Sequence, residues 1–198
     1  MRDGRAAAFP EELLTGRLFA RRLLPSDLDQ LTSMHADPAV MATLGGMRTR
    51  EETVGFLDRL LEHWRTHGFG LWLLQSREGG EFVGRGGLLT VEVDARVEVE
   101  LAYALTPRWW GRGLATELAV ASVRLAFEVL ELPSLICMTL PTNDASRRVM
   151  HKAGFCYEKD VVHRGLDHVL CRISRERWAG LSREPPYRDQ PASLVPKA

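Results

Sequence analysis

Two glycines and two arginines stand close together in the middle of the chain, in Arg108-Trp109-Trp110-Gly111-Arg112-Gly113-Leu114. Glycine lets a backbone bend tightly where a strand ends, and a helix that starts there has unpaired N–H groups. The aligned peptide dipoles add about half a positive charge at the helix start, and Arg108 and Arg112 add more. The segment therefore predicts a site for a phosphate or pyrophosphate. An ordinary strand-to-helix turn is the alternative.

Other glycine motifs fit this chain poorly. A dinucleotide loop of the Rossmann type needs a third Gly or Ala where Thr116 stands, and Pro107 to Trp110 separate strand and glycines too widely. The Gly-Lys-Ser/Thr of a Walker A loop is absent. Gly84-Arg85-Gly86-Gly87 lies inside a strand-like run, so we expect a bulge or a close backbone approach there.

Hydrophobic periodicity predicts the elements that position the loop. A capping box formed by Thr49 and Glu52 marks the start of one helix. The order β-α-α-β-β-β-α-β-α-β-β indicates an α+β fold with a mixed sheet and helices packed on it. Strands are expected near 17–23, 69–76, 81–93, 96–105 and 134–140, from 155 and over 168–174, and helices near 26–36, 49–66, from 114 toward Pro133, and over 143–153.

Length and charge limit the classes of protein. The 198 residues suit one domain, over 15–180, with an N-terminal extension (1–14) and a C-terminal tail (181–198). The formal charge is zero, which argues against nucleic acid or an anionic membrane as a partner. No run resembles a signal peptide or a membrane span. We therefore expect a soluble, cytoplasmic protein.

The cysteines and histidines give no sign of a metal site. Cys137, Cys156 and Cys171 contain no Cys-x-x-Cys pair, so neither a zinc site nor a disulfide framework is predicted. His63 and His67 are spaced i,i+4 without the His-Glu-x-x-His pattern. We interpret that pair as part of the solvated face of a helix.

Several segments together resemble the GNAT acetyltransferases, and within them the RimJ/RimL-like branch of ribosomal-protein N-terminal acetyltransferases. The resemblance spans about Thr15 to Trp178 and implies a GNAT-like, mostly antiparallel central sheet flanked by helices. The segments that carry it are TGRLFARRLLPSDL, HADPAV, ELAYALTPRWWGRGLATE, PTNDASRRVMHKAGF and HRGLDHVLCRISRERW.

The resemblance implies acetyl-CoA as the cofactor. Its pyrophosphate would lie at the loop 110–115, where Trp110 stands in place of the family's Gln or Arg. The backbone of 103–105 would pair with the pantetheine arm like an added strand. Asn143 either contacts the cofactor or only caps its helix. The residues implied to bind the cofactor are Tyr103, Ala104, Leu105, Arg108, Trp110, Gly111, Arg112, Gly113, Leu114, Ala115, Thr116, Asn143, Ser146, Arg147 and Lys152.

The implied reaction is direct transfer of an acetyl group to an amine, which needs a base. Glu100 is the first choice, because its strand runs into the cofactor loop and it begins the family's Glu-x-x-Tyr pattern; Glu98 shares its face. Asp160 is the second choice and His163 the third, and a surface ion pair is the alternative for each.

The proton donor for the leaving thiolate is less obvious. Met150 stands where many relatives have a tyrosine that acts as the acid, so Ser146, Cys137 or solvent must replace it. A covalent acyl-enzyme on Cys137 is disfavoured, because no histidine stands beside it in sequence.

The acceptor amine is implied only broadly, as a protein or peptide N-terminus or a small amine. The resemblance places its pocket among residues 34–64 and 165–168, which contain His35, Met41, Met47, Trp64 and His168. Core packing is the alternative for Met41 and Trp64. A catalytically silent CoA-binding sensor or scaffold and a nicotinamide-dependent enzyme are the competing functions. We expect a monomer or a homodimer.

Overall fold

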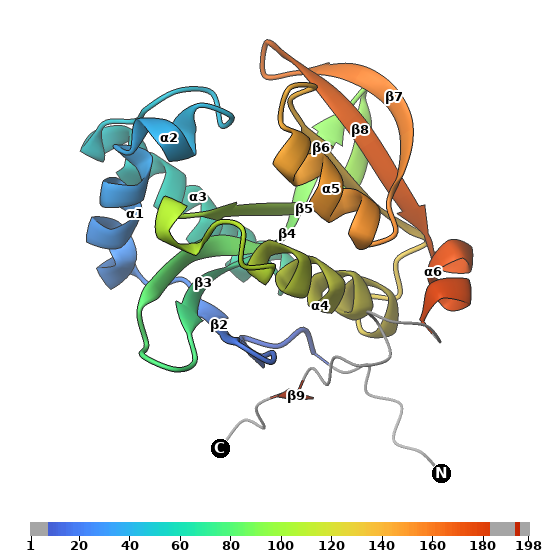
Figure 1. Ribbon diagram of the computed structural model, residues 1–198, viewed down its shortest axis with the longest axis horizontal. Helices are drawn as coiled ribbons and strands as arrows, with labels where there is room; N and C mark the ends of the chain where they lie inside the picture. Colours follow the sequence, from blue (N-terminus) through green and yellow to red (C-terminus); the bar gives the residue numbers. More distant parts are fainter. Residues whose placement is uncertain (1–7, 183–192, 195–198) are drawn as a thin grey trace.

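The computed structural model describes residues 8–182 and 193–194, and it has one extended sheet with helices on both faces (Figure 1). The strands are β1 (Glu12–Leu14), β2 (Leu18–Arg22), β3 (Leu71–Ser76), β4 (Phe82–Val93), β5 (Arg96–Leu105), β6 (Ser134–Thr139), β7 (Cys156–His163), β8 (Leu166–Ser174) and β9 (Ser193–Leu194). The α-helices are α1 (Leu28–His35), α2 (Pro38–Met41), α3 (Arg50–His67), α4 (Leu114–Glu128), α5 (Asp144–Lys152) and α6 (Arg175–Leu181), and short 3-10 turns η1 (Pro25–Asp27) and η2 (Pro107–Trp109) precede α1 and α4.

The strands lie in the order β7-β8-β6-β5-β4-β3-β2-β1-β9. Every neighbouring pair is antiparallel except β5 and β6, which run parallel and meet at Glu100 and Ile136. A parallel pair needs a long crossover, and η2 with α4 supplies it. The predicted α+β fold with a mostly antiparallel sheet is confirmed.

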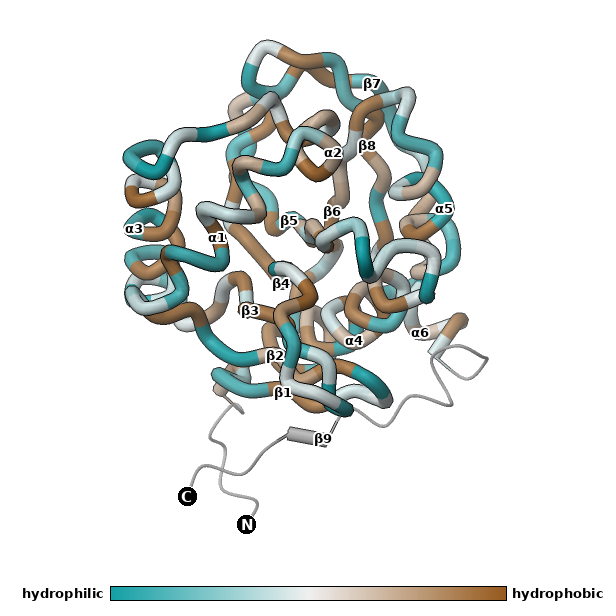
Figure 2. The backbone as a smooth tube through the Cα atoms, turned by 60° about the vertical axis from the view of Figure 1, so that its left-hand side comes forward, coloured by the Kyte–Doolittle hydropathy of each residue, from teal (hydrophilic) through white to brown (hydrophobic). Residues whose placement is uncertain are grey.

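Alternating side chains divide the core between the two faces of the sheet. Leu71 and Leu73 of β3 pack under α1 and α3, whereas Trp72 and Leu74 join the larger cluster that lies under α4. In Figure 2 the helices α1 and α3 stand on one side of β5 and β6, and α5 stands on the other. The line where β5 meets β6 therefore has helices on both sides.

Glycines in β4 allow close packing at the centre of the sheet. A Cβ at Gly84 would lie 2.2 Å from the Ala104 carbonyl oxygen, and one at Gly86 would lie 2.5 Å from a methyl of Leu118 on α4. The register between β3 and β4 also shifts between Leu74 and Gln75. Of the two alternatives expected at Gly84–Gly87, the close backbone approach is confirmed, and the register irregularity lies just before it, at Val83.

The predicted order of elements is confirmed, but the sequence did not predict the short elements β1, α2, α6 and β9. β1 pairs with β2 and β9, and Phe9 is buried against Trp72 at a centroid distance of 5.0 Å. Residues on both sides of the predicted domain boundaries therefore take part in the sheet. Within 8–182 and 193–194, no helix combines the length and apolar character that crossing a membrane requires.

The interpretation of His63 as part of a solvated helix face is wrong. Its Nδ1 lies 2.9 Å from the carbonyl oxygen of Phe69, and its Nε2 accepts a hydrogen bond from the Thr90 amide at 2.9 Å. Burial, followed by the neighbouring His67, lowers the pKa of His63. The neutral ring ties α3 to the strands, because the chain turns back at Gly68 and brings β3 and β4 beside it.

Candidate active site

A cavity of about 580 Å³ opens where β5 ends, between α2, the start of α4 and α5. Most residues that the sequence analysis assigned to a cofactor lie in its wall. Arg148, which with Arg147 and Lys152 was a candidate for the adenosine phosphate, also lines it, as do residues 39, 40, 43 and 44, Trp109, Ala145 and Val149, which were not predicted. The predicted residues in the wall are Tyr103, Ala104, Leu105, Trp110, Gly111, Gly113, Leu114, Ala115, Thr116, Asn143, Ser146 and Lys152.

The loop before α4 has the backbone shape that the sequence predicted. Gly111 and Gly113 have φ values of 71° and 76°, and Gly113 caps α4 in the left-handed conformation. The indole N–H of Trp110 donates to the Leu105 carbonyl at 2.7 Å, and that of Trp109 donates to the Phe82 carbonyl at 3.0 Å. The two tryptophans thus fix the loop against β4 and β5, while Leu114 to Thr116, in the first turn of α4, line the cavity.

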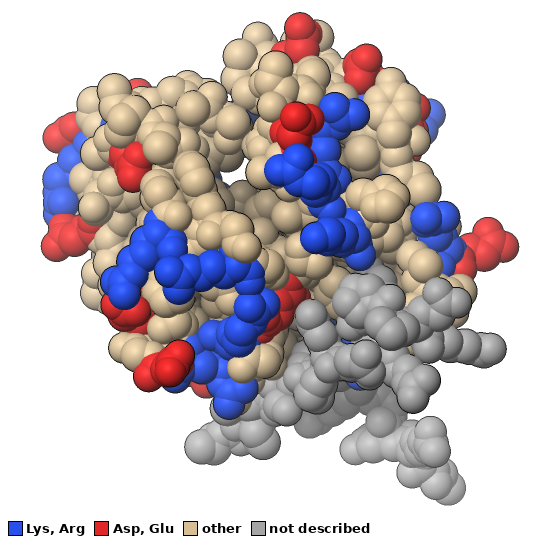
Figure 3. All heavy atoms as spheres, in the orientation of Figure 1, with Lys and Arg blue, Asp and Glu red and all other residues tan. Residues whose placement is uncertain are grey.

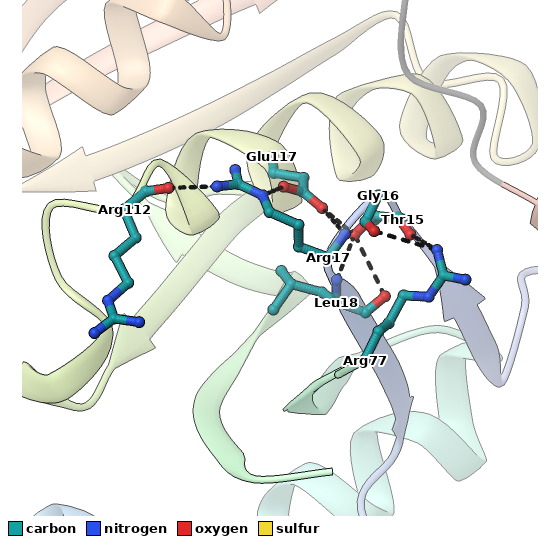
Figure 4. Close-up of polar contacts among 7 residues, drawn as sticks. All are labelled: Thr15, Gly16, Arg17, Leu18, Arg77, Arg112 and Glu117. Atoms are coloured by element: carbon teal, nitrogen blue, oxygen red, sulfur yellow. Dashed lines mark hydrogen bonds and ion pairs between the residues drawn. The ribbon is translucent and has the colours of Figure 1, made fainter. Parts of the chain in front are cut away.

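A polar clamp holds this loop to the β1–β2 turn (Figure 4). The buried Glu117 accepts hydrogen bonds from the Thr15 hydroxyl at 2.5 Å and from the Arg17 amide and Nε at 2.7 Å each. Arg17 also donates to the Arg112 carbonyl at 2.7 Å, inside the glycine loop. Burial opposes ionisation of Glu117, but the hydrogen bonds from Thr15 and Arg17 outweigh it and lower its pKa.

Lys and Arg side chains border a hollow on the face shown in Figure 3. Arg148 and Lys152 of α5 line the cavity itself. Arg108, Arg112 and Arg147 do not: Arg108 pairs with Glu81 at 2.6 Å, and Arg112 lies over the Trp109 ring at 5.1 Å. Arg147 faces a second, smaller cavity between α5 and β7–β8. Arg108, Arg112 and Arg147 were predicted to bind the cofactor, and the structure places all three outside the wall of the main cavity.

The start of α5 brings hydroxyl groups to the cavity. The Asn143 side chain caps the helix, accepting from the Ser146 amide at 3.1 Å, and it also lines the cavity. The Ser146 hydroxyl lies 2.8 Å from the phenol of Tyr103. Burial raises the pKa of Tyr103, so this phenol keeps its proton. Met150 is buried, with its sulfur 3.9 Å from the Ser146 hydroxyl.

Glu100 lies where β5 and β6 meet, on the face of the sheet that α1 and α3 cover. Burial raises its pKa to about 7, although Arg164, a hydrogen bond from the Met138 backbone and Arg85 favour the charged form. A carboxyl group with a pKa near 7 can accept a proton at physiological pH and release it again. Glu98 instead forms an ion pair with Arg172 at 3.0 Å.

The other candidates for proton transfer lie elsewhere. Neither Glu100 nor Asp160 lines the cavity, but Glu100 is three residues before Tyr103 on a strand that does, whereas Asp160 is exposed on the edge strand β7 and interacts with Tyr157. His163 lies near the β7–β8 turn, with its ring centroid 6.0 Å from that of His168. Cys137 is fully buried, and burial raises its pKa well above the ordinary value, which disfavours a thiolate nucleophile.

The candidate acceptor residues separate into core and surface. Trp64 is buried and donates to the Leu71 carbonyl at 2.7 Å, and Met41 is fully buried. Met47 is exposed, and Nδ1 of His168 lies 2.9 Å from the Leu166 carbonyl oxygen. His35 is buried beside Thr53 and Phe56. Core packing, the alternative for Trp64 and Met41, therefore accounts for both of these residues.

Comparison with known proteins assigns the family. Residues 17–156 match the model of the acetyltransferase (GNAT) domain, and the chain belongs to this family. The uncharacterized protein YkkB of Bacillus subtilis is 28% identical over 153 residues, which cover 76% of this chain and 88% of YkkB. The crystal structure of an acetyltransferase from Agrobacterium tumefaciens is 28% identical, with a TM-score of 0.73 over 87% of this chain and 99% of that one.

A relative with a named activity covers less of the chain. The FsC-acetyl coenzyme A-N(2)-transacetylase of Aspergillus fumigatus is 34% identical over 125 residues, which are 56% of this chain and 52% of that protein. The chain thus matches about half the length of that enzyme.

The residues present fit acetyl-CoA, the cofactor of GNAT acetyltransferases. A pyrophosphate suits the amides at the start of α4, where no side chain projects from Gly111 or Gly113. Lys152 and Arg148 supply positive charge on the opposite wall. The apolar and backbone surface of 103–105 leads from this loop toward the meeting point of β5 and β6.

Proposed function

We propose that the protein is an N-acetyltransferase that moves the acetyl group of acetyl-CoA to a primary amine by direct transfer in a ternary complex. The acceptor in this proposal is a protein or peptide N-terminus or a small amine. The motifs of the RimJ/RimL-like branch and the partial likeness to an N(2)-transacetylase support N-acetylation. The cytoplasmic location and the state of a monomer or homodimer stay predictions.

The observation that carries the proposal is the position of Glu100. It lies on β5 at the point where β6 begins to pair, and the same strand continues into the cavity wall at Tyr103 to Leu105. When bound, acetyl-CoA supplies a thioester whose carbonyl carbon an amine can attack. Glu100 accepts the proton that the amine must lose, directly or through water. Its raised pKa suits that role, because the group gains and loses a proton near neutral pH.

The Tyr103–Ser146 pair is our candidate for the proton donor. Both side chains line the cavity, and their oxygen atoms are 2.8 Å apart. The phenol or the hydroxyl can give its proton to the departing sulfur, and the pair can regain it from water. Met150 fills the position of the tyrosine found in many relatives, so the chain needs such a substitute if it is active.

Calorimetric titration with acetyl-CoA tests the cofactor, with CoA, NADH and ATP as controls. We expect a Kd of about 1 μM, a binding free energy of about −8 kcal/mol, for the CoA compounds and no binding of NADH or ATP. An amine panel with detection of released thiol then tests transfer. Selective binding of CoA compounds without turnover on any amine would instead favour the catalytically silent sensor or scaffold. Met150 supports that alternative, because a buried methionine cannot donate the proton that a tyrosine at this position would supply.

The Glu100→Gln variant tests the base. We expect kcat to fall by about 100-fold with little change in acetyl-CoA affinity, because the carboxylate acts on the amine. Glu92→Gln, at an exposed site on β4, serves as the matched control. If Glu100→Gln keeps the wild-type rate at every pH, Glu100 is not the base.

A further inference from the structure

Three arginines lie near one another on the α1–α3 side of the sheet, in the neighbourhood of Glu100. Arg85 comes from β4, Arg48 from the segment between α2 and α3, and Arg164 from the β7–β8 turn. Arg85 and Arg164 each act electrostatically on Glu100, and all three guanidinium groups act on one another. Segments far apart in sequence thus bring three cations together, two of which act on one carboxylate.

Arg85 is buried, and Glu100 acts on its charge without forming a hydrogen-bonded ion pair with it. Its side chain is on the same face as Leu73 and Ala104, its register partners, and the residue is only 6% exposed. The guanidinium lies 4.7 Å from the centroid of the Phe56 ring, and its Nε has no hydrogen-bond partner. Burial, with Arg48 and Arg164 adding to it, lowers the pKa of Arg85 to about 10. At neutral pH the side chain stays charged.

Arg48 approaches the same aromatic ring. Its guanidinium lies 5.0 Å from the Phe56 centroid, and its Nη1 is buried without a hydrogen-bond partner. His35 also packs on Phe56, at 4.9 Å between ring centroids, and its Nε2 is likewise unpaired. Burial, with help from Arg85 and Arg48, lowers the pKa of His35 to about 3, so the ring is neutral and does not balance the charge.

Arg164 joins the group from the β7–β8 turn. It has a φ of 52° and precedes Gly165 with a φ of 76°, so the two form a tight left-handed turn at the end of the hairpin. That turn lies close to the segment before Arg48, because a Cβ at Gly45 would be 4.0 Å from a methyl of Leu166. The exposed Arg164 and the half-buried Arg48 can therefore converge on one ligand.

Positive charge exceeds negative charge at this place. Glu52 and Arg59 of α3 act on Arg48 as well, but the Glu52 carboxylate is occupied at the Thr49 amide in the capping box. Among residues 8–182, no carboxylate lies within 4.0 Å of a nitrogen of Arg48, Arg85 or Arg164. A buried cation that lacks a partner is costly, and a bound anion removes most of that cost.

We infer that the acceptor is an amine that also carries a carboxylate, which Arg48, Arg85 and Arg164 bind while Glu100 faces the amine. The inference rests on the proposed acetyltransferase function and narrows its acceptor to amines of the amino-acid type. Arginine binds carboxylates through paired N–H groups, and unpaired N–H groups are present here. The same charges repel polyamines and other polycationic amines.

The cations also favour the reaction step. An ammonium group near three guanidinium groups loses its proton more readily, because like charges disfavour its charged form. Glu100 then receives that proton, and the amine attacks in its neutral form. Recognition of the carboxylate and deprotonation of the amine thus depend on one cluster.

Matched acceptors test the inference on the full-length protein. The pairs are alanine with alaninamide and phenylalanine with phenylalaninamide, and spermidine is the polycation. The first measurement is kcat/KM for acetylation at saturating acetyl-CoA. The second measurement is the melting temperature of the protein in the presence of each compound. Benzoate and benzamide form a further matched pair in this measurement, because neither carries an amine. We expect the carboxylates to exceed their amides by about tenfold or more in kcat/KM, or to stabilise the protein where the amides do not.

Substitutions then assign the preference to the cluster. Arg48→Gln is expected to reduce the carboxylate preference by about tenfold, and Arg164→Gln, at an exposed turn that tolerates the change, by about threefold. Arg65→Gln is the control, because Arg65 is an exposed arginine of α3 that pairs with Glu62. Its preference should equal that of the wild type.

The outcomes separate this inference from the proposed function. If amides or spermidine are acetylated as well as the carboxylates, or if carboxylates show no advantage in either measurement, the inference is wrong while the acetyltransferase proposal stands. If acetyl-CoA does not bind in calorimetry, the proposed function itself fails. A carboxylate preference that survives in both Arg48→Gln and Arg164→Gln would also overturn the assignment to this cluster.

Discussion

The phenol oxygen of Tyr103 lies 2.8 Å from the hydroxyl oxygen of Ser146, although the two residues are 43 positions apart. Tyr103 comes from β5 and Ser146 from the first turn of α5, and both line the cavity. The resemblance to the GNAT family implies a proton-donating tyrosine one turn further along α5, where Met150 is buried here. A tyrosine on a different element thus brings a phenol to the same helix.

We predict that Tyr103→Phe and Ser146→Ala each lower kcat by about tenfold or more while the Kd for acetyl-CoA changes little. The two effects should not add in the double variant, because the residues share one hydrogen bond. Steady-state kinetics and calorimetry measure both quantities, with Tyr157→Phe as an exposed control. Full activity in the double variant would mean that solvent protonates the thiolate.

Glu100 should make stability depend on pH. Its pKa in the folded protein is about 7, above the ordinary 4.5, so the folded state binds the proton more tightly than the unfolded state. The free energy of unfolding should therefore fall as pH rises from about 4.5 through about 7, by about 3 kcal/mol in all. Melting curves recorded from about pH 5 to about pH 8 measure this loss of stability. Glu100→Gln should remove the slope, and a parallel curve for that variant would contradict the shift.

His35 should act in the opposite direction. Its pKa is lowered from 6.5 to about 3, so between these pH values the unfolded chain binds a proton at His35 and the folded protein does not. Stability should be lost as pH falls below 6.5, by up to about 1.4 kcal/mol per pH unit. Chemical denaturation of wild type and His35→Gln at matched pH values measures the difference. An equal loss in both proteins would show that His35 does not contribute.

The clamp around Glu117 should control acetyl-CoA affinity through the glycine loop. Glu117→Gln should cost about 1–3 kcal/mol of stability, because buried hydrogen bonds to a charged group are lost. Arg17→Met should cost less than about 1 kcal/mol, since Arg17 is 55% exposed, yet it removes the bond to the Arg112 carbonyl. We expect both variants to raise the Kd several-fold. An unchanged Kd for Arg17→Met would show that the loop keeps its shape alone.

A side chain at Gly113 should block the cofactor. Gly113 has a φ of 76° and lines the cavity, and a Cβ there would also meet Arg17 at 3.4 Å. We expect Gly113→Val to weaken acetyl-CoA binding by about tenfold or more, through both strain and bulk. Gly68→Val is the control, because Gly68 has a φ of 72° at the end of α3, away from the cavity wall. Binding that survives in Gly113→Val would mean that the pyrophosphate lies elsewhere.

Local chemistry explains why much of the fold was predictable. The capping box of Thr49 and Glu52, the alternating residues of β5 and the helical repeat after Leu114 each act over a few neighbouring residues. The short β1, α2 and α6 contain too few residues to show such a repeat, so packing against the rest of the fold decides them. The glycine loop was predictable for the same reason as the long elements, because Gly111 and Gly113 determine its backbone directly.

The candidate site divides in the same way. The sequence alone determined the family, the loop at the start of α4 and the position of Glu100 within the strand that leads to it. Only the tertiary structure decided that Tyr103 meets Ser146, that Glu117 holds the loop, and that Arg48, Arg85 and Arg164 come near one another on the side of the sheet where Glu100 lies. The physical reason is that backbone conformation follows from adjacent residues, whereas burial and charge depend on which distant segments the packed sheet brings together.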